Sequence, residues 1–243
     1  MPATHSVKSD IHKLTISHAI NFFGVAALTP YQPEIAAEWG ELMASYPQGI
    51  SIGISLLHPI VDQLPKRLEE NSVRFNYRQH AFAIVNERLD LTASLISSTL
   101  QSAGFRAFPV SASQQTNKEK LSGMISHKMV ARLAGLGWIG KSCLLVTPQA
   151  GPRVRWATIL TDAPLPVRSE ILEERCGLCR LCVDICPAGA FTGENFRHGE
   201  PRGVRYDAHL CNRYLDELEE KQGFPAVCGM CLYICPYGRN RHS

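Results

Sequence analysis

The chain has 243 residues, of which 45% are hydrophobic and 19% are charged, and its mean hydropathy is close to zero. This composition is typical of one or two folded domains and excludes disordered, collagen-like and coiled-coil chains. The formal net charge of +3 is too small to indicate a nucleic-acid partner by itself.

The first half of the chain predicts alternating helices and strands. Residues 11–23 place apolar side chains at helical spacing, and residues 25–28 then predict a short buried strand. A second helix is expected to begin after Pro33. The run GISIGISLL over residues 49–57 is rich in β-branched side chains and predicts a central strand.

The same alternation continues up to the cysteine-rich segment. A long helix is predicted over residues 78–102, followed by a strand over residues 105–110. Another helix is predicted over residues 124–133, and residues 143–147 and 154–160 predict two adjacent strands. We therefore expect an α/β layer domain over residues 1–165, with a linker around Pro164–Pro166 and a second domain over residues 166–243.

A glycine-rich turn matches two nucleotide-binding patterns at once. Residues 135–142 read GLGWIGKS, which fits both G-x-x-x-x-G-K-S and, over its first six residues, G-x-G-x-x-G. Both sites need a strand before the loop and a helix after it, whereas here a helix is predicted first and a strand second. We therefore interpret the turn as a helix C-cap with Gly135 or Gly137 at positive φ. A loop that binds some other cofactor is the remaining alternative.

Cysteine usage separates the two ends of the chain. Eight of the nine cysteines lie between Cys176 and Cys235, and only Cys143 precedes them. The N-terminus lacks the pattern of a signal peptide, and no apolar run approaches the roughly 20 residues that cross a bilayer. We therefore expect a cytoplasmic protein that does not bind membranes, in which clustered thiols bind metal and a buried Cys143 is inert.

The cysteine spacing predicts two 4Fe-4S clusters. Cys-x2-Cys-x2-Cys-x3-Cys-Pro begins at Cys176, and Cys228-x2-Cys231-x3-Cys235-Pro repeats it without the first cysteine, which Cys211 replaces. Because the fourth cysteine of such a run binds the other cluster, the predicted ligand sets are crossed. Structural zinc is the alternative, although zinc sites usually pair two separate C-x2-C units. The predicted sets are Cys176, Cys179, Cys182 and Cys235 for one cluster, and Cys186, Cys211, Cys228 and Cys231 for the other.

Several segments together resemble the epoxyqueuosine reductase family. The resemblance covers nearly the whole chain and is weaker before Ala131, where it includes NYRQHAFAIVNERL from Asn76. The more specific segments are ARLAGLGWIGKSCLLV, ILTDAPLP, CGLCRLCVDICPAGA, LCNRYLDE and CGMCLYICPY.

The resemblance implies an α+β protein with a nitroreductase-like, corrinoid-binding domain followed by a bacterial-ferredoxin-like module with two clusters. It also implies that the clusters supply electrons to cobalamin, and it supports Cys211 as a ligand. Tyr77 aligns with a family tyrosine and is a candidate for the corrinoid pocket, with a packed structural tyrosine as the alternative. Gly137, Gly140 and Lys141 of the glycine turn are further candidate cofactor-binding residues.

Two departures from the family pattern limit what is carried over. The position of the family's catalytic aspartate is Leu121, which cannot donate a proton, so the catalytic residue is unknown. The helical-repeat domain that follows the clusters in these reductases is not expected here, and tRNA is therefore not expected as a partner.

We therefore expect an iron–sulfur oxidoreductase whose clusters reduce a cofactor, cobalamin by resemblance, that acts on a small or nucleoside-type substrate. A low-potential ferredoxin or flavodoxin is the expected electron donor. One alternative is a ferredoxin-like carrier that activates a corrinoid on another protein, and another is a cluster-bearing scaffold or sensor. His127 on its predicted helix is interpreted as solvated or satisfied rather than as a ligand.

Overall fold

The computed structural model describes residues 2–167, 170–223 and 226–239. The chain forms two compact units, and each of them is assembled from three segments. Unit 1 comprises residues 1–55, 84–137 and 155–172, and unit 2 comprises residues 56–83, 138–154 and 173–243. The units therefore do not follow the single boundary after residue 165, and that domain division stays a prediction.

Unit 1 is a four-stranded sheet with helices on both faces. Its strand order is β1-β2-β6-β3, with β1 antiparallel to β2 and β3 antiparallel to β6. The strands are β1 (Phe22–Ala27), β2 (Gln48–Ser55), β3 (Ala107–Val110) and β6 (Val154–Thr161). The helices are α1 (Pro2–Ser17), the 3-10 helix η1 (Thr29–Tyr31), α2 (Gln32–Trp39), α3 (Glu41–Ala44), α6 (Val85–Ser102) and α7 (His127–Leu133).

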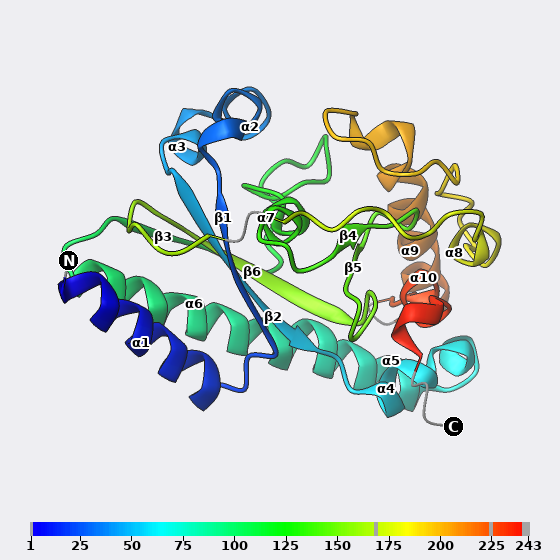
Figure 1. The fold of residues 1–243 in the computed structure, drawn as a ribbon. Helices are drawn as coiled ribbons and strands as arrows, with labels where there is room; N and C mark the ends of the chain where they lie inside the picture. Colours follow the sequence, from blue (N-terminus) through cyan, green and yellow to red (C-terminus); the bar gives the residue numbers. More distant parts are fainter. Residues whose placement is uncertain (1, 168–169, 224–225, 240–243) are drawn as a thin grey trace. The chain divides into compact units, whose positions relative to one another are not determined.

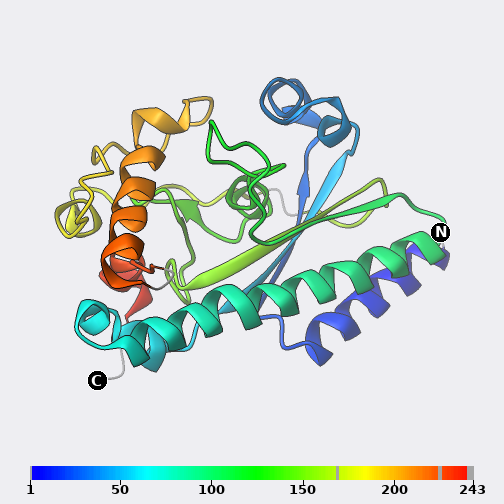
Figure 2. The ribbon, with the colours of Figure 1, turned by 180° about the vertical axis from the view of Figure 1, so that it is seen from behind.

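Helices α1 and α6 lie side by side along the sheet in both views (Figures 1 and 2). Arg155 on β6 donates to Asn86 on α6, whereas Thr158, three residues further, hydrogen-bonds to His127 on α7. Residues three apart on a strand point to opposite faces, so α6 and α7 cover opposite faces of the sheet. The α7 side holds an apolar core that includes Leu28, Met43, Val130, Leu133 and Leu160.

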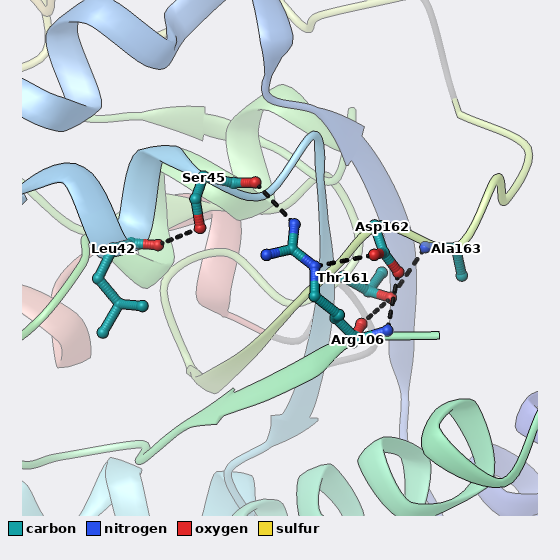
Figure 3. A network of polar contacts seen from close by, with 6 residues as sticks. All are labelled: Leu42, Ser45, Arg106, Thr161, Asp162 and Ala163. Atoms are coloured by element: carbon teal, nitrogen blue, oxygen red, sulfur yellow. Dashed lines mark hydrogen bonds and ion pairs between the residues drawn. The ribbon is translucent and has the colours of Figure 1, made fainter. Parts of the chain in front are cut away.

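A polar network lies at one end of this sheet, where β6 ends and β3 begins (Figure 3). Arg106, just before β3, donates from its backbone N–H and from Nε to the two carboxylate oxygens of Asp162, at 2.8 and 2.9 Å. Arg106 also donates to the Ser45 carbonyl oxygen at 3.1 Å, and its own carbonyl accepts from Thr161. Burial opposes ionisation of Asp162, but the Arg106 bonds outweigh it and lower the pKa of this carboxyl.

Unit 2 consists of short elements joined by long loops. Strands β4 (Trp138–Ile139) and β5 (Leu145–Val146) form its antiparallel ribbon. Apart from one helix of 15 residues, the helical elements have eight residues or fewer, as is typical of a module that wraps around cofactors rather than around a large apolar core. They are α4 (His58–Asp62), η2 (Leu64–Leu68), α5 (Asn71–Arg78), a π-helical turn (Gln79–Ile84), α8 (Leu181–Asp184), η4 (Arg202–Val204), α9 (Ala208–Gln222), α10 (Met230–Tyr233) and η5 (Pro236–Gly238).

Several boundaries differ from the predicted ones for local reasons. The first helix ends at Ser17, and the chain turns through Ala19 at φ +50° before β1 begins at Phe22, inside the range predicted as helix. Helix α7 begins at His127 because the Ser126 hydroxyl accepts from the Met129 N–H as an N-cap. No helix among the described residues is long and apolar enough to cross a membrane.

Candidate functional site

Unit 2 brings the eight clustered cysteines together from three segments. Four lie in the loop around α8, Cys211 lies in the first turn of α9, and three flank or lie in α10. Asp207 begins α9 by accepting the backbone N–H groups of His209 and Leu210, which fixes the turn that carries Cys211. All eight are free thiols of intermediate exposure, whereas Cys143 is buried, as predicted.

The thiols of the first predicted set influence one another. Burial, followed by negative charge on Cys176, Cys235 and Cys179, raises the pKa of Cys182 to about 11. Burial also raises the pKa of Cys235, which Cys179 raises as well. Cys235 is 53 residues or more away from the other three in sequence, so the fold brings it to this group.

The second predicted set shows the same pattern. Burial raises the pKa of Cys231, and negative charge on Cys228, Cys211 and Cys186, and last on Cys182 of the first set, adds to that rise. Burial is also the largest cause of the raised pKa of Cys228, and negative charge on Cys211 and Cys186 raises that pKa further. A thiol whose pKa is raised in this way becomes a stable thiolate when it binds iron, because the metal supplies the missing positive charge.

The eight thiols therefore suit two 4Fe-4S clusters in their chemistry and in their grouping. Within the described ranges, no three His, Cys, Asp or Glu side chains converge closely enough to bind a single metal ion. The thiolates of a cubane bind separate irons, so a cluster does not require such convergence. The assignment of individual cysteines to each cluster stays a prediction.

The glycine turn supports the first cysteine group. It runs from α7 into β4, the predicted order of helix then strand, and Gly135 has φ +71°. Lys141 is buried, and its Nζ donates to the Gly177 carbonyl oxygen at 2.7 Å, inside the first Cys-x2-Cys turn. At Gly140 an added Cβ would lie 3.3 Å from Cys176 Sγ and 2.9 Å from Val146, so this position has no room for a side chain.

Tyr77 lies against the second cysteine group. It is 4% exposed on α5, and an added Cβ at Gly229 would lie 3.1 Å from its hydroxyl oxygen and 2.8 Å from Leu64 Cδ1. Gly229 has φ +68° and directly follows Cys228, so close packing shapes this turn. Tyr77 also contacts the half-exposed ring of Phe82 edge-on at 5.9 Å. A role of Tyr77, Gly140 or Lys141 toward a corrinoid stays a prediction.

The remaining candidates lie in unit 1. Gly137 closes the glycine turn at the end of a segment of this unit. Leu121 has φ +47° in a tight turn in which Asn117 and Ser122 exchange backbone hydrogen bonds. His127 is satisfied, as predicted, because both of its ring nitrogens have partners.

Two buried arginines near the cysteines carry no sequence signal and were not predicted. Arg153 is 1% exposed and interacts with Cys235, and Arg67 is 5% exposed and interacts with Cys228. Isolated arginines resemble surface residues in a sequence, since arginine is rarely buried. Only the packing around them reveals their position.

Comparison with protein families and curated proteins supports this site. Residues 175–238 match the model of a 4Fe-4S double cluster binding domain. An epoxyqueuosine reductase of Pseudomonas aeruginosa is 33% identical over 167 residues, which is 64% of this chain and 40% of that protein. The chain spans less than half the length of the curated relatives it matches.

Solved structures show the same fold at lower identity. A reductive dehalogenase whose description names B12-dependent dehalogenation has a TM-score of 0.66 at 19% identity, covering 95% of this chain and 31% of its own. An epoxyqueuosine reductase bound to a modified tRNA-Tyr stem loop has a TM-score of 0.59 at 17% identity, covering 97% of this chain and 66% of its own. The sequence-based prediction that excluded tRNA as a partner is wrong, because it rested on charge and on a missing domain, and this similar reductase holds a tRNA stem loop.

Proposed function

Because the chain is a relative of the epoxyqueuosine reductases, as its sequence predicted, we propose that it is an iron–sulfur oxidoreductase that reduces a bound corrinoid. Two 4Fe-4S clusters in residues 166–243 carry electrons to a cofactor held mainly by residues 1–165, a domain with nitroreductase-like layers. A reducing cytoplasm suits this assignment, since it keeps the cysteines available as thiolates.

The grouping of the eight thiols in unit 2 is the observation that carries this proposal. Each group of four includes a cysteine from the other group's sequence run, which is the arrangement of two-cluster ferredoxins. This grouping supports the ligand sets that we propose. They are Cys176, Cys179, Cys182 and Cys235 for the first cluster and Cys186, Cys211, Cys228 and Cys231 for the second.

The corrinoid assignment is supported by the family and by an apolar surface in unit 2. When bound, a corrinoid supplies a cobalt centre that passes reducing equivalents to the substrate. Phe75 and Phe82 are 56% and 44% exposed, and Tyr77 packs against Phe82. These rings would cover a macrocycle face, and Gly137, Gly140 and Lys141 stay further proposed cofactor-binding residues.

The substrate class is a small molecule or a modified nucleoside, including one carried by RNA. A similar solved reductase holds an epoxyqueuosine-modified tRNA stem loop, so a stem loop of this kind is the first substrate to test. Leu121 cannot supply a proton, so another group of this chain or the solvent must do so. A ferredoxin or flavodoxin would supply low-potential electrons.

Metal and cofactor analysis of protein purified without oxygen tests the proposal. We expect about eight irons and eight sulfides per chain, and stoichiometric binding of cob(II)alamin with a shift of its visible and EPR spectra. Zinc, or near four irons, would refute the two clusters. Eight irons without corrinoid binding would instead favour an electron carrier, and clusters that dithionite does not reduce would favour a scaffold or sensor. Turnover of the modified stem loop with a reduced flavodoxin would then define the substrate.

A further inference from the structure

Each cysteine group in unit 2 has one buried arginine beside it, and the two arginines differ in their partners. Arg153 donates to the carbonyl oxygen of Tyr233, two residues before Cys235, and Arg67 donates to the hydroxyl of Tyr214, three residues after Cys211. They are 1% and 5% exposed, so solvent screens neither charge effectively. Neither arginine is part of the predicted ligand sets.

A carboxylate balances the charge of Arg153. Its Nη1 lies 2.7 Å from Asp62 Oδ1 and 2.9 Å from His58 Nδ1, and its Nη2 donates to the Tyr233 carbonyl oxygen at 3.2 Å. The Asp62 carboxylate offsets the charge of the Arg153 guanidinium, so the ion pair adds little net charge beside Cys235.

Arg67 is held only by neutral groups. Its Nη1 donates to the Leu64 carbonyl oxygen at 3.3 Å and its Nη2 to the Tyr214 hydroxyl at 3.5 Å. The Nε atoms of both arginines lack a hydrogen-bond partner, but no carboxylate among the described residues forms a salt bridge with Arg67. A buried charge without a counter-charge is costly, so a negative group placed beside it is strongly favoured.

The packing of η2 places this charge beside the second cysteine group. Helices η2 and α10 are in contact, and Leu64 on η2 leaves no room for a side chain at Gly229. Arg67 Nη1 donates to the Leu64 carbonyl oxygen, and its Nη2 donates to the hydroxyl of Tyr214, which lies on α9 three residues after Cys211. The guanidinium therefore lies beside the two segments that carry Cys211 and Cys228.

We propose that Arg67 makes the cluster of Cys186, Cys211, Cys228 and Cys231 easier to reduce than the other cluster, because its buried charge has no carboxylate partner. Reduction adds one negative charge to a cluster, and the net charge of the surroundings sets its potential. With both clusters bound, one electron would pass from the reduced first cluster to the oxidised second cluster, and this exchange needs no proton. The inference rests on the two proposed clusters but not on the corrinoid or the substrate.

The test is a redox titration of the anaerobic, cluster-loaded full chain, followed by EPR. We expect two midpoint potentials in the wild type. Arg67→Gln should lower the higher one, with a decrease of at least about tenfold in the reduction equilibrium, or about 59 mV. Arg67→Lys keeps the charge and should stay near the wild type. Lys66→Gln removes the same charge from an exposed neighbour and should change neither midpoint.

A variant at Asp62 tests the cluster beside Arg153, and its result does not depend on whether Arg67→Gln folds. Asp62 is 49% exposed, so Asp62→Asn is expected to fold, and it leaves the charge of Arg153 unbalanced. The lower midpoint should then rise toward the higher one. The inference is overturned if Arg67→Gln keeps eight irons but leaves the higher midpoint unchanged, or if Asp62→Asn does not move the lower one. Fewer than two clusters in the wild type would instead refute the proposed function.

Discussion

Mild acid is expected to destabilise the protein through His127. The Ser111 carbonyl oxygen only accepts, so Nε2 donates to it at 3.0 Å, and Nδ1 accepts the Thr158 hydroxyl proton at 2.8 Å. The neutral ring satisfies both partners, and protonation removes the acceptor that Thr158 uses. Burial lowers the pKa of His127 to about 4, although the Ser111 bond opposes that shift.

The sign and size of the effect follow from the two pKa values. Above pH 6.5 His127 is neutral in the folded and unfolded chain, so its contribution to stability is complete. Between pH 6.5 and 4 the unfolded chain binds a proton that the folded chain does not, and stability is lost. The loss is about 1.4 kcal/mol at pH 5.5 and about 3 kcal/mol at its limit. These are upper values, since water reaches part of this residue.

The assay is urea unfolding of the anaerobic, cluster-loaded protein at pH 7.5 and 5.5. His127→Gln keeps one donor and one acceptor but does not titrate, so its free energy of unfolding should fall less than that of the wild type between the two pH values. The difference should approach about 1.4 kcal/mol. His12→Gln, on the exposed side of α1, should retain the wild-type pH dependence. Equal losses in the wild type and His127→Gln would refute the reasoning, and the comparison cancels any acid sensitivity of the clusters.

Three further substitutions test the supports of the site and of the sheet. Lys141→Met removes a charged hydrogen bond worth about 1.5–3 kcal/mol and should speed iron release to a chelator, whereas Lys141→Arg should restore part of the wild-type rate. Gly229→Ala combines positive φ with a contact on Leu64 and should cost about 1–3 kcal/mol and lower the iron content. Gly177→Ala, with positive φ but open space, should cost less, and equal effects would contradict the packing argument. Arg106→Ala removes a half-exposed ion pair and should lower the free energy of unfolding by about 1 kcal/mol or less, whereas a larger loss would show that the network is more than a surface pair.

The local pattern of apolar and β-branched residues was enough to predict much of unit 1. The β-branched run at residues 49–57 became β2 (Gln48–Ser55), and the strand predicted at 154–160 became β6 (Val154–Thr161). These segments have two buried faces and an unambiguous composition. Boundaries were less predictable, because the segment predicted as one helix over 78–102 contains a π-helical turn at Gln79–Ile84 before α6.

The cluster motif was equally readable from sequence, because iron–sulfur coordination fixes the spacing of its thiolates. Eight cysteines at these intervals predict the donor type and the cluster type without any coordinates. The match of residues 175–238 to a double cluster binding domain confirms that prediction. The prediction of a helix before the glycine turn and a strand after it was also confirmed, since this order is a local property of the sequence.

Tertiary structure alone decided which residues surround the thiols. Lys141, Arg67 and Arg153 look alike in a sequence, yet one donates to a cysteine turn, one is buried without a carboxylate, and one is paired with Asp62. Spacing along the chain predicts which residue type binds the metal, since most of the cysteines in each run are separated by two or three residues. The charge around that metal depends on segments far apart in the chain, and only folding brings them together.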